Sequence, residues 1–281
     1  KRKYRAIDDA TANDLNKASA VTEHLQLGST DKNVNQLKVM GRLSRNSKRT
    51  NKKKAKLAGW VLDEKDAYRQ IAVDPEQRKY AVVAVKNPVT GEVNFFIMTG
   101  HSFGLVAAVY NYNRRSALID EILEEVFWVP ANFFYDDKYG FETTDTVDQA
   151  GRIVERVHQL LGADFSRKKL QRSTHPVILG IEYNLETMHL EITKERSEDL
   201  RKQIDEILND RHLTSGVAGK LKGKLLFASS VLWGKVGRAF MLALSERQYN
   251  KEKRTALNQP IKLALHQWKK LINTAPKRPL E

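Results

Sequence analysis

Residues 131–142 read ANFFYDDKYGFE, in which two short aromatic-rich segments flank the acidic pair Asp136 and Asp137. Aromatic residues favour strands, and a polar pair between two such segments is typical of a β-hairpin turn. Adjacent aspartates at a turn often serve only to form the turn, because their side chains hydrogen-bond to the nearby backbone. What this pair does therefore depends on what lies beside the hairpin.

A second acidic residue ends an apolar run earlier in the chain. Residues 57–63 read LAGWVLD, which is consistent with a buried strand that ends in Asp63. If this strand and the hairpin are neighbours in one sheet, Asp63, Asp136 and Asp137 converge; we call these three residues the aspartate cluster. Uncompensated carboxylates repel one another, and their oxygens select hard cations such as Mg²⁺. Because a carboxylate-held metal pair performs nucleotidyl transfer, the cluster is our candidate catalytic and metal-binding site.

The composition limits the kind of protein. The 281 residues are 41% hydrophobic and 29% charged, as expected of a folded chain with one large or two small domains. We find no apolar run of about 18 residues and no signal-peptide core, so we expect an intracellular protein with no membrane partner. The absence of cysteine excludes disulfides, thiolate metal sites and a cysteine nucleophile. P-loop, Rossmann and zinc-hydrolase motifs are also absent.

The net charge of +14 is concentrated in one stretch. Residues 42–56 read RLSRNSKRTNKKKAK, with eight basic residues and no acid. We expect a loop that binds a polyanion, whereas the alternative is a solvated loop or a localisation signal. The basic residues of this stretch, our candidate RNA-binding residues, are Arg42, Arg45, Lys48, Arg49, Lys52, Lys53, Lys54 and Lys56.

Hydrophobic periodicity predicts mixed strands and helices for about two thirds of the chain and helices alone thereafter. Strands are predicted over 57–63, 79–85, 92–98, the two arms of 131–142, 176–183 and 188–193. Helices are predicted over 103–128, from 147 to a stop at Gly162, over 200–208, 217–243 and 261–272.

Several segments, in this order, resemble those of reverse transcriptases. KYRAIDDATANDLN (3–16) resembles the fingers segment, VLDEKDAYRQIAV (61–73) the first palm motif, SFGLVAAVYNYNR (102–114) the template-contacting helix, and FYDD (134–137) the catalytic hairpin. LGADFSRKKLQ (161–171), followed by PVILGIEY, is similar to the later palm and primer grip. AGKLKGKLLFASSVLWGKVGRAF (218–240) resembles the thumb of DIRS-like, tyrosine-recombinase retrotransposon polymerases.

The resemblance implies an α+β fold of the right-hand polymerase type. Residues 1–56 would be a partial fingers region with the basic loop 42–56. Residues 57–193 would be the palm, with an antiparallel sheet and the fingers hairpin 79–98. Residues 194–281 would be a helical, thumb-like region.

The resemblance also implies roles in the palm. The aspartate cluster would hold two Mg²⁺ ions. Tyr68 would be the aromatic gate beneath the sugar, which leaves no room for a 2′-hydroxyl and so selects deoxynucleotides. Phe103 and Gly104 would begin the helix that contacts the template and the new base pair. Ordinary core packing is the alternative explanation for the two rings.

Basic residues would contact the incoming nucleotide at two places. Lys3 and Arg5 match the fingers cations that clamp the triphosphate, a role that needs charge together with hydrogen-bond donors. Lys168 or Lys169 would be the cation near the leaving pyrophosphate, and the sequence does not choose between them.

Two departures from the family pattern keep the question of activity open. Phe134 takes the place of the usual Tyr, and Tyr135 puts a large ring where a smaller residue is usual. One hypothesis is RNA-templated DNA synthesis with Mg²⁺ on a template–primer. The other is a domesticated, non-catalytic subunit without cofactor that binds structural RNA among other proteins of a ribonucleoprotein, such as a mitochondrial ribosome. A maturase or splicing-factor relative is a third. The sequence does not decide whether the protein is located in the nucleus or the mitochondrion. It also leaves open whether the chain is part of a longer polyprotein.

Overall fold

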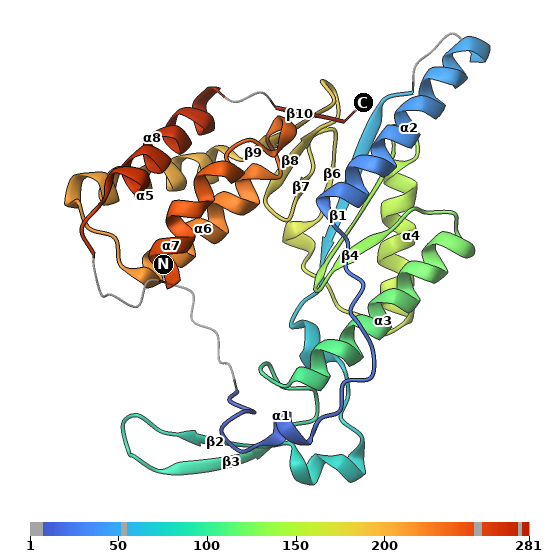
Figure 1. Ribbon diagram of the computed structural model, residues 1–281. Helices are drawn as coiled ribbons and strands as arrows, with labels where there is room; N and C mark the ends of the chain where they lie inside the picture. The colour runs from blue at the N-terminus through green and yellow to red at the C-terminus, as the bar shows by residue number, and fades with distance from the viewer. Residues whose placement is uncertain (1–7, 52–54, 250–254, 275–276, 281) are drawn as a thin grey trace. The chain divides into compact units, whose positions relative to one another are not determined.

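The structure, a computed structural model, describes residues 8–51, 55–249, 255–274 and 277–280 (Figure 1). The chain divides into two compact units, one formed by residues 1–29 and 59–172 and the other by 30–58 and 173–281. The bounds of these two units differ from those of the predicted fingers, palm and thumb. The division into fingers, palm and thumb stays a prediction. Within the described residues, no helix is both long and apolar enough to cross a membrane.

The first unit is built on a four-stranded sheet with the order β4-β5-β1-β6. Its strands are β1 (Leu57–Asp63), β4 (Asn132–Phe134), β5 (Asp137–Thr143) and β6 (Gln171–Ser173). β1 is buried up to its last residue, which explains why its sequence is a continuous apolar run rather than an alternating one. β4 and β5 form an antiparallel hairpin. The strand predicted at 57–63 and the hairpin at 131–142 are therefore confirmed.

Two helices, α3 (Val106–Glu125) and α4 (Val147–Leu160), pack on this sheet. α3 contacts β4, α4 contacts β5, and the helices contact each other. Tyr112, Ile119 and Leu123 are fully buried on α3 at spacings of seven and four residues, which place them on one face of the helix.

Both helices were expected, but α3 begins at Val106 rather than at Phe103, after Gly104 with its φ of 106°. The apolar side chain of Leu118 on α3 is exposed. α4 stops before Gly162, whose φ of 72° is the left-handed conformation that favours glycine.

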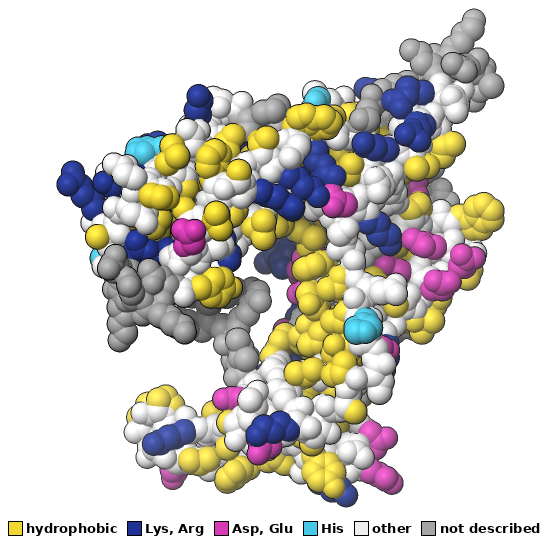
Figure 2. Space-filling model, in the orientation of Figure 1, with side chains coloured by type: hydrophobic (Ala, Val, Ile, Leu, Met, Phe, Trp, Pro, Cys, Tyr) yellow, Lys and Arg dark blue, Asp and Glu magenta, His cyan; other side chains and the backbone are white. Residues whose placement is uncertain are grey.

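A separate hairpin of β2 (Val82–Lys86) and β3 (Val93–Ile97) is confirmed near the predicted bounds. Its large apolar side chains, including Phe95, Phe96 and Ile97, remain exposed, and Figure 2 shows hydrophobic surface on it at the bottom of the view. Short turns of helix complete the first unit. They are α1 (Leu15–Ala18), η1 (Ala67–Gln70), η2 (Pro75–Tyr80) and η3 (Arg167–Lys169).

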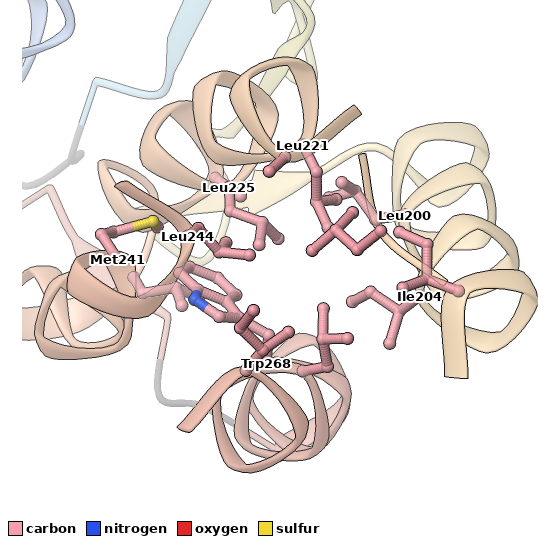
Figure 3. Close-up of a cluster of buried hydrophobic side chains, with 14 residues drawn as sticks. Leu200, Ile204, Leu221, Leu225, Met241, Leu244 and Trp268 are labelled. Atoms are coloured by element: carbon pink, nitrogen blue, oxygen red, sulfur yellow. The ribbon is translucent and has the colours of Figure 1, made fainter. Parts of the chain in front are cut away.

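The second unit combines α2 (Thr30–Asn51), a four-stranded sheet with the order β10-β9-β8-β7, and a helical region. The strands are β7 (Val177–Ile178), β8 (Ile181–Asn184), β9 (His189–Ile192) and β10 (Arg278–Pro279). The helices are α5 (Lys194–Asp210), α6 (Ser215–Ser229), α7 (Met241–Tyr249) and α8 (Gln259–Thr274), with the short turns η4 (Trp233–Lys235) and η5 (Arg238–Phe240). Leu200, Ile204, Leu225 and Trp268 lie at the centre of the apolar core between these helices (Figure 3).

The prediction of a loop over 42–56 is wrong for most of its length. α2 continues to Asn51, because Val34, Leu37, Gly41 and Ser44 form one buried stripe at helical spacing. Lysine and arginine are also good helix formers, and nothing before Asn51 breaks the helix. Residues 52–54 lie outside the described part.

Two predicted elements are interrupted by residues with positive φ. The strand predicted over 176–183 divides into β7 and β8 at Leu179 (φ 53°) and Gly180 (φ 74°). The helix predicted over 217–243 ends as α6 at Ser229, and Gly234 (φ 63°) and Gly237 (φ 95°) lie in the interruption before α7. A Cβ on Gly237 would lie 2.5 Å from the Trp268 ring, so this break also allows close packing.

Candidate metal centre

The aspartate cluster lies where two neighbouring strands of the first sheet meet. β1 ends at Asp63, and its neighbour β5 begins at Asp137. Asp137 pairs with the last residue of β4, so Tyr135 and Asp136 form a two-residue turn. The backbone N–H of Glu64 donates to the carbonyl oxygen of Asp136 at 3.0 Å. The end of β1 is thereby tied to the turn that carries the acidic pair.

The turn itself contains strained backbone. Tyr135 has a φ of 54°, a conformation that two-residue hairpin turns need and that Asn or Gly adopts more readily. A bulky residue in this region costs about 1–3 kcal/mol. The Tyr135 ring packs edge to face on Phe134, with ring centroids 5.0 Å apart. Strain of this kind is common at functional sites.

The three carboxylates influence one another electrostatically. The pKa of Asp137 is raised to about 6, first by burial and then by the negative charges of Asp136 and Asp63. The Lys169 ammonium acts in the opposite direction. The cluster therefore holds unbalanced negative charge at neutral pH, which favours a bound cation.

A lysine already contacts the cluster. Lys169, on η3, lies with its Nζ 2.6 Å from Oδ1 of Asp63, and its side chain is 55% exposed. Of the two lysines that the sequence could not separate, Lys169 is the one that contacts an aspartate of the cluster. The ammonium group and a metal ion would compete for the same carboxylate oxygen.

The donor chemistry of the cluster fits a hard divalent ion such as Mg²⁺, since carboxylate oxygens are its usual protein ligands. In the described part of the chain, no group of three or more His, Asp or Glu side chains is arranged as a ready metal site. Binding would therefore require Lys169 to leave Asp63 and the carboxylates to turn toward a shared ion. Coordination by the cluster stays a prediction.

Replacing Asp137 with Asn should stabilise the metal-free protein at pH 7.5. The folded-state pKa is raised above that of the unfolded chain, so ionisation of Asp137 destabilises the fold as the pH rises from about 4 through about 6. The gain should appear as a rise of roughly 2–4 °C in Tm, for about 1 kcal/mol, and should vanish near pH 4. Thermal unfolding with a chelator at both pH values measures it, with the exposed Asp145→Asn as control. Equal Tm values at pH 7.5 would contradict the repulsion described above.

Replacing Lys169 with Met should strengthen Mn²⁺ binding to the nucleic-acid-free protein by up to about fivefold. A half-exposed ion pair contributes about 0.2–1 kcal/mol, which the metal no longer has to overcome. Calorimetric titration with Mn²⁺ measures the change, and the adjacent Lys168→Met is the matched control. If both variants bind Mn²⁺ alike, Lys169 does not compete for the site.

Tyr68 lies close enough to the cluster for the charge of Asp136 to act on its hydroxyl. Its ring packs edge to face on Phe103 and on Tyr112, with centroids 5.3 Å apart in each case. Burial raises the pKa of the Tyr68 hydroxyl, and the negative charge of Asp136 adds to this. Gly104 has a φ of 106°, and its carbonyl oxygen accepts from Asn16 Nδ2 at 3.0 Å. Tyr68 and Phe103 therefore form one aromatic contact next to the acidic turn, and their roles toward a nucleotide stay predictions.

The other predicted residues are not brought to the cluster by any described contact. Lys3 and Arg5 lie outside the described residues, as do Lys52, Lys53 and Lys54. Arg42, Arg45, Lys48 and Arg49 belong to α2, and Lys56 is exposed just before β1. All of this basic stretch belongs to the second unit. Its RNA binding stays a prediction that rests on charge.

Sequence reasoning missed the buried polar residues behind the cluster. Glu64, Lys138 and His158 are fully buried and lie close together, with Arg115 beside them. The available signal was positional, because Glu64 and Lys138 directly follow two aspartates of the cluster. In a strand, the residue after an outward-facing one points to the opposite face.

No family model matches the sequence, and no curated protein matches it. Among solved structures, the fold is similar to that of the foamy viral protease-reverse transcriptase dRH in complex with double-stranded DNA. That match has a TM-score of 0.59 at 13% identity and covers 79% of this chain and 36% of the other. The foamy viral protease-reverse transcriptase in complex with an RNA/DNA hybrid matches with a TM-score of 0.57 at 13% identity, over 78% of this chain and 27% of the other. The fold is reverse-transcriptase-like.

This likeness confirms the prediction of an α+β, reverse-transcriptase-like fold with antiparallel sheets. The chain spans 36% and 27% of the two viral proteins. At 13% identity the likeness extends to the fold alone. Three finer points therefore stay predictions: the resemblance to DIRS-like retrotransposon polymerases, the division into palm and thumb, and the roles of single residues.

Proposed function

We propose that this chain is a nucleic-acid-binding, reverse-transcriptase-like domain that copies RNA into DNA with two divalent ions held by the aspartate cluster. The observation that carries the proposal is the meeting of three carboxylates at the adjoining ends of β1 and β5, with a lysine ammonium beside them. The reverse-transcriptase-like fold and the net charge of +14 support it, because a polyanionic template needs a basic partner.

The chain's own residues would divide the work. Asp63, Asp136 and Asp137 would hold magnesium, which when bound activates the attacking hydroxyl and stabilises the leaving oxygen. The Lys169 ammonium, displaced from Asp63, would neutralise charge on the departing phosphates. The Tyr68 ring, which packs on Phe103, would form one wall of the site for the nucleotide sugar.

Primer extension tests the proposal. A labelled DNA primer on an RNA template, with Mg²⁺ and deoxynucleotides, should be lengthened by the wild-type chain. Extension should stop when a chelator is added. The same template–primer without the protein is the control.

A second candidate is RNA binding without catalysis. It is favoured by two observations: Lys169 contacts Asp63, and the large Tyr135 ring is kept in the turn despite backbone strain. Tight RNA binding together with no extension under any divalent ion would support this candidate and reject the first.

A further inference from the structure

A buried ionic group lies on the far side of the sheet from the aspartate cluster. Glu64 and Lys138 directly follow Asp63 and Asp137, so strand alternation turns them away from the cluster and toward α3 and α4. The Glu64 side chain is 0% exposed and that of Lys138 is 1% exposed. Charged side chains are almost never this deeply buried unless they are paired.

Glu64 is the centre of this group. Arg115 of α3 donates to Oε2 of Glu64. Lys138 Nζ lies 3.7 Å from Oε1, and Nε2 of His158, on α4, also lies 3.7 Å from Oε1. One carboxylate thus joins the end of β1 to α3 through Arg115, and it lies beside Lys138 of β5 and His158 of α4.

The other contacts of His158 and Lys138 show which of the two carries a charge. His158 Nδ1 donates to the Val154 carbonyl at 2.8 Å, and burial lowers the pKa of His158 to about 4, so its ring is neutral. Lys138 Nζ lies 4.6 Å from the centre of the Phe133 ring and 5.7 Å from that of Tyr112. At 3.7 Å, Lys138 is held to Glu64 by charge and by these rings rather than by a close hydrogen bond.

A buried ionic group often stabilises a core less well than apolar side chains do. Burying two charges has a large desolvation cost, and apolar residues of similar volume are often at least as stabilising. A charge pair does, however, prefer one separation, and it joins the two backbone segments that carry Asp63 and Asp137. Partners that orient metal ligands typically contribute about 10–100-fold to metal affinity, and Glu64 and Lys138 would act on Asp63 and Asp137 through the backbone rather than by hydrogen bonds.

We infer that Glu64 and Lys138 are positioning residues, which keep the end of β1 and the start of β5 together so that Asp63 and Asp137 can turn toward a shared divalent ion. The inference rests on the proposed function, because it assumes that the aspartate cluster binds metal. It adds a role for two residues that do not touch the metal or the nucleic acid.

Calorimetric Mn²⁺ titration of folded variants tests the inference. Glu64→Gln keeps the size of the side chain and an acceptor for Arg115, and it should weaken Mn²⁺ binding by about 10–100-fold. Two controls should bind Mn²⁺ as the wild type does. Glu121→Gln removes an exposed charge from α3, and Leu123→Ala removes buried apolar packing from α3 about two turns beyond Arg115.

A double variant separates positioning from packing. Glu64→Leu with Lys138→Leu removes the buried pair together, and it leaves Arg115, whose side chain is 16% exposed, without its carboxylate partner. Tm should therefore fall, and the weak Mn²⁺ affinity of Glu64→Gln should persist in the folded variant. If the double variant folds and binds Mn²⁺ like the wild type, the pair is only packing and the inference is wrong. This variant also decides the question if Glu64→Gln fails to fold.

Asp63→Asn distinguishes this failure from failure of the proposed function. If the wild type binds Mn²⁺, Asp63→Asn does not, and the Glu64 and double variants bind normally, only the positioning role is rejected. If the wild type binds no Mn²⁺, or Asp63→Asn binds it equally well, the metal site is rejected and the positioning role with it.

Discussion

Replacing Asp136 with Asn should reduce primer extension by a factor on the order of 10³ and leave RNA affinity nearly unchanged. Asp136 lies in the strained turn beside the end of β1, where its charge acts on both Asp137 and the Tyr68 hydroxyl. Metal ions contribute several kcal/mol of transition-state stabilisation, and about 4 kcal/mol corresponds to that factor. Single-turnover extension and RNA binding should be measured on the same preparation.

The exposed Asp145, in the turn before α4, is the matched control for this variant. Asp145→Asn removes the same charge from the same unit and should extend the primer at the wild-type rate. If Asp136→Asn extends the primer as fast as Asp145→Asn, the aspartate cluster is not the catalytic centre.

Replacing Lys52, Lys53, Lys54 and Lys56 together with Ser should weaken RNA binding broadly across sequences. Each phosphate contact contributes about 0.7 on single strands, and about 0.9 on duplex, to the slope of log affinity against log salt. The slope should therefore flatten by up to about three units, and the loss of affinity should be largest at low salt. Stability should change little, because none of the four lysines lies in an apolar periodic run, and substitutions away from the core usually cost under about 0.5 kcal/mol.

The same four positions changed to Arg form the control, since the charge is kept. This variant should retain the wild-type salt slope. An unchanged slope in the Ser variant would mean that the basic stretch is a solvated charge run and that RNA is bound elsewhere.

Much of the first unit could be predicted because its local patterns agree with its fold. The apolar run of 57–63, the aromatic hairpin at 131–142 and the amphipathic helix α4 each bury the face that their sequence indicates, whereas α3 buries Asn113 and Ser116 and leaves Leu118 exposed. The basic stretch was misjudged because its charge suggested a loop, whereas the stripe from Val34 to Ser44 extends α2 into it. Strand β10 is too short to give a periodic signal.

The candidate site could be predicted only in part, for a physical reason. Carboxylates at strand ends are visible in a sequence, so the aspartate cluster could be found there. A charged residue is normally exposed, so burial of Glu64 and Lys138 becomes visible only when α3 and α4 are in place. The choice of Lys169 over Lys168 likewise depends on the direction of the short turn η3.

Electron paramagnetic resonance of Mn²⁺ bound to the wild-type chain, with template–primer and deoxynucleotide present, tests the central claim most directly. We expect two bound ions per chain with the magnetic coupling of a pair roughly 3.5–4 Å apart, and we expect the coupled signal to disappear in Asp63→Asn. Absence of a coupled pair in the wild type, or a pair that survives in Asp63→Asn, would contradict a two-metal site at the aspartate cluster.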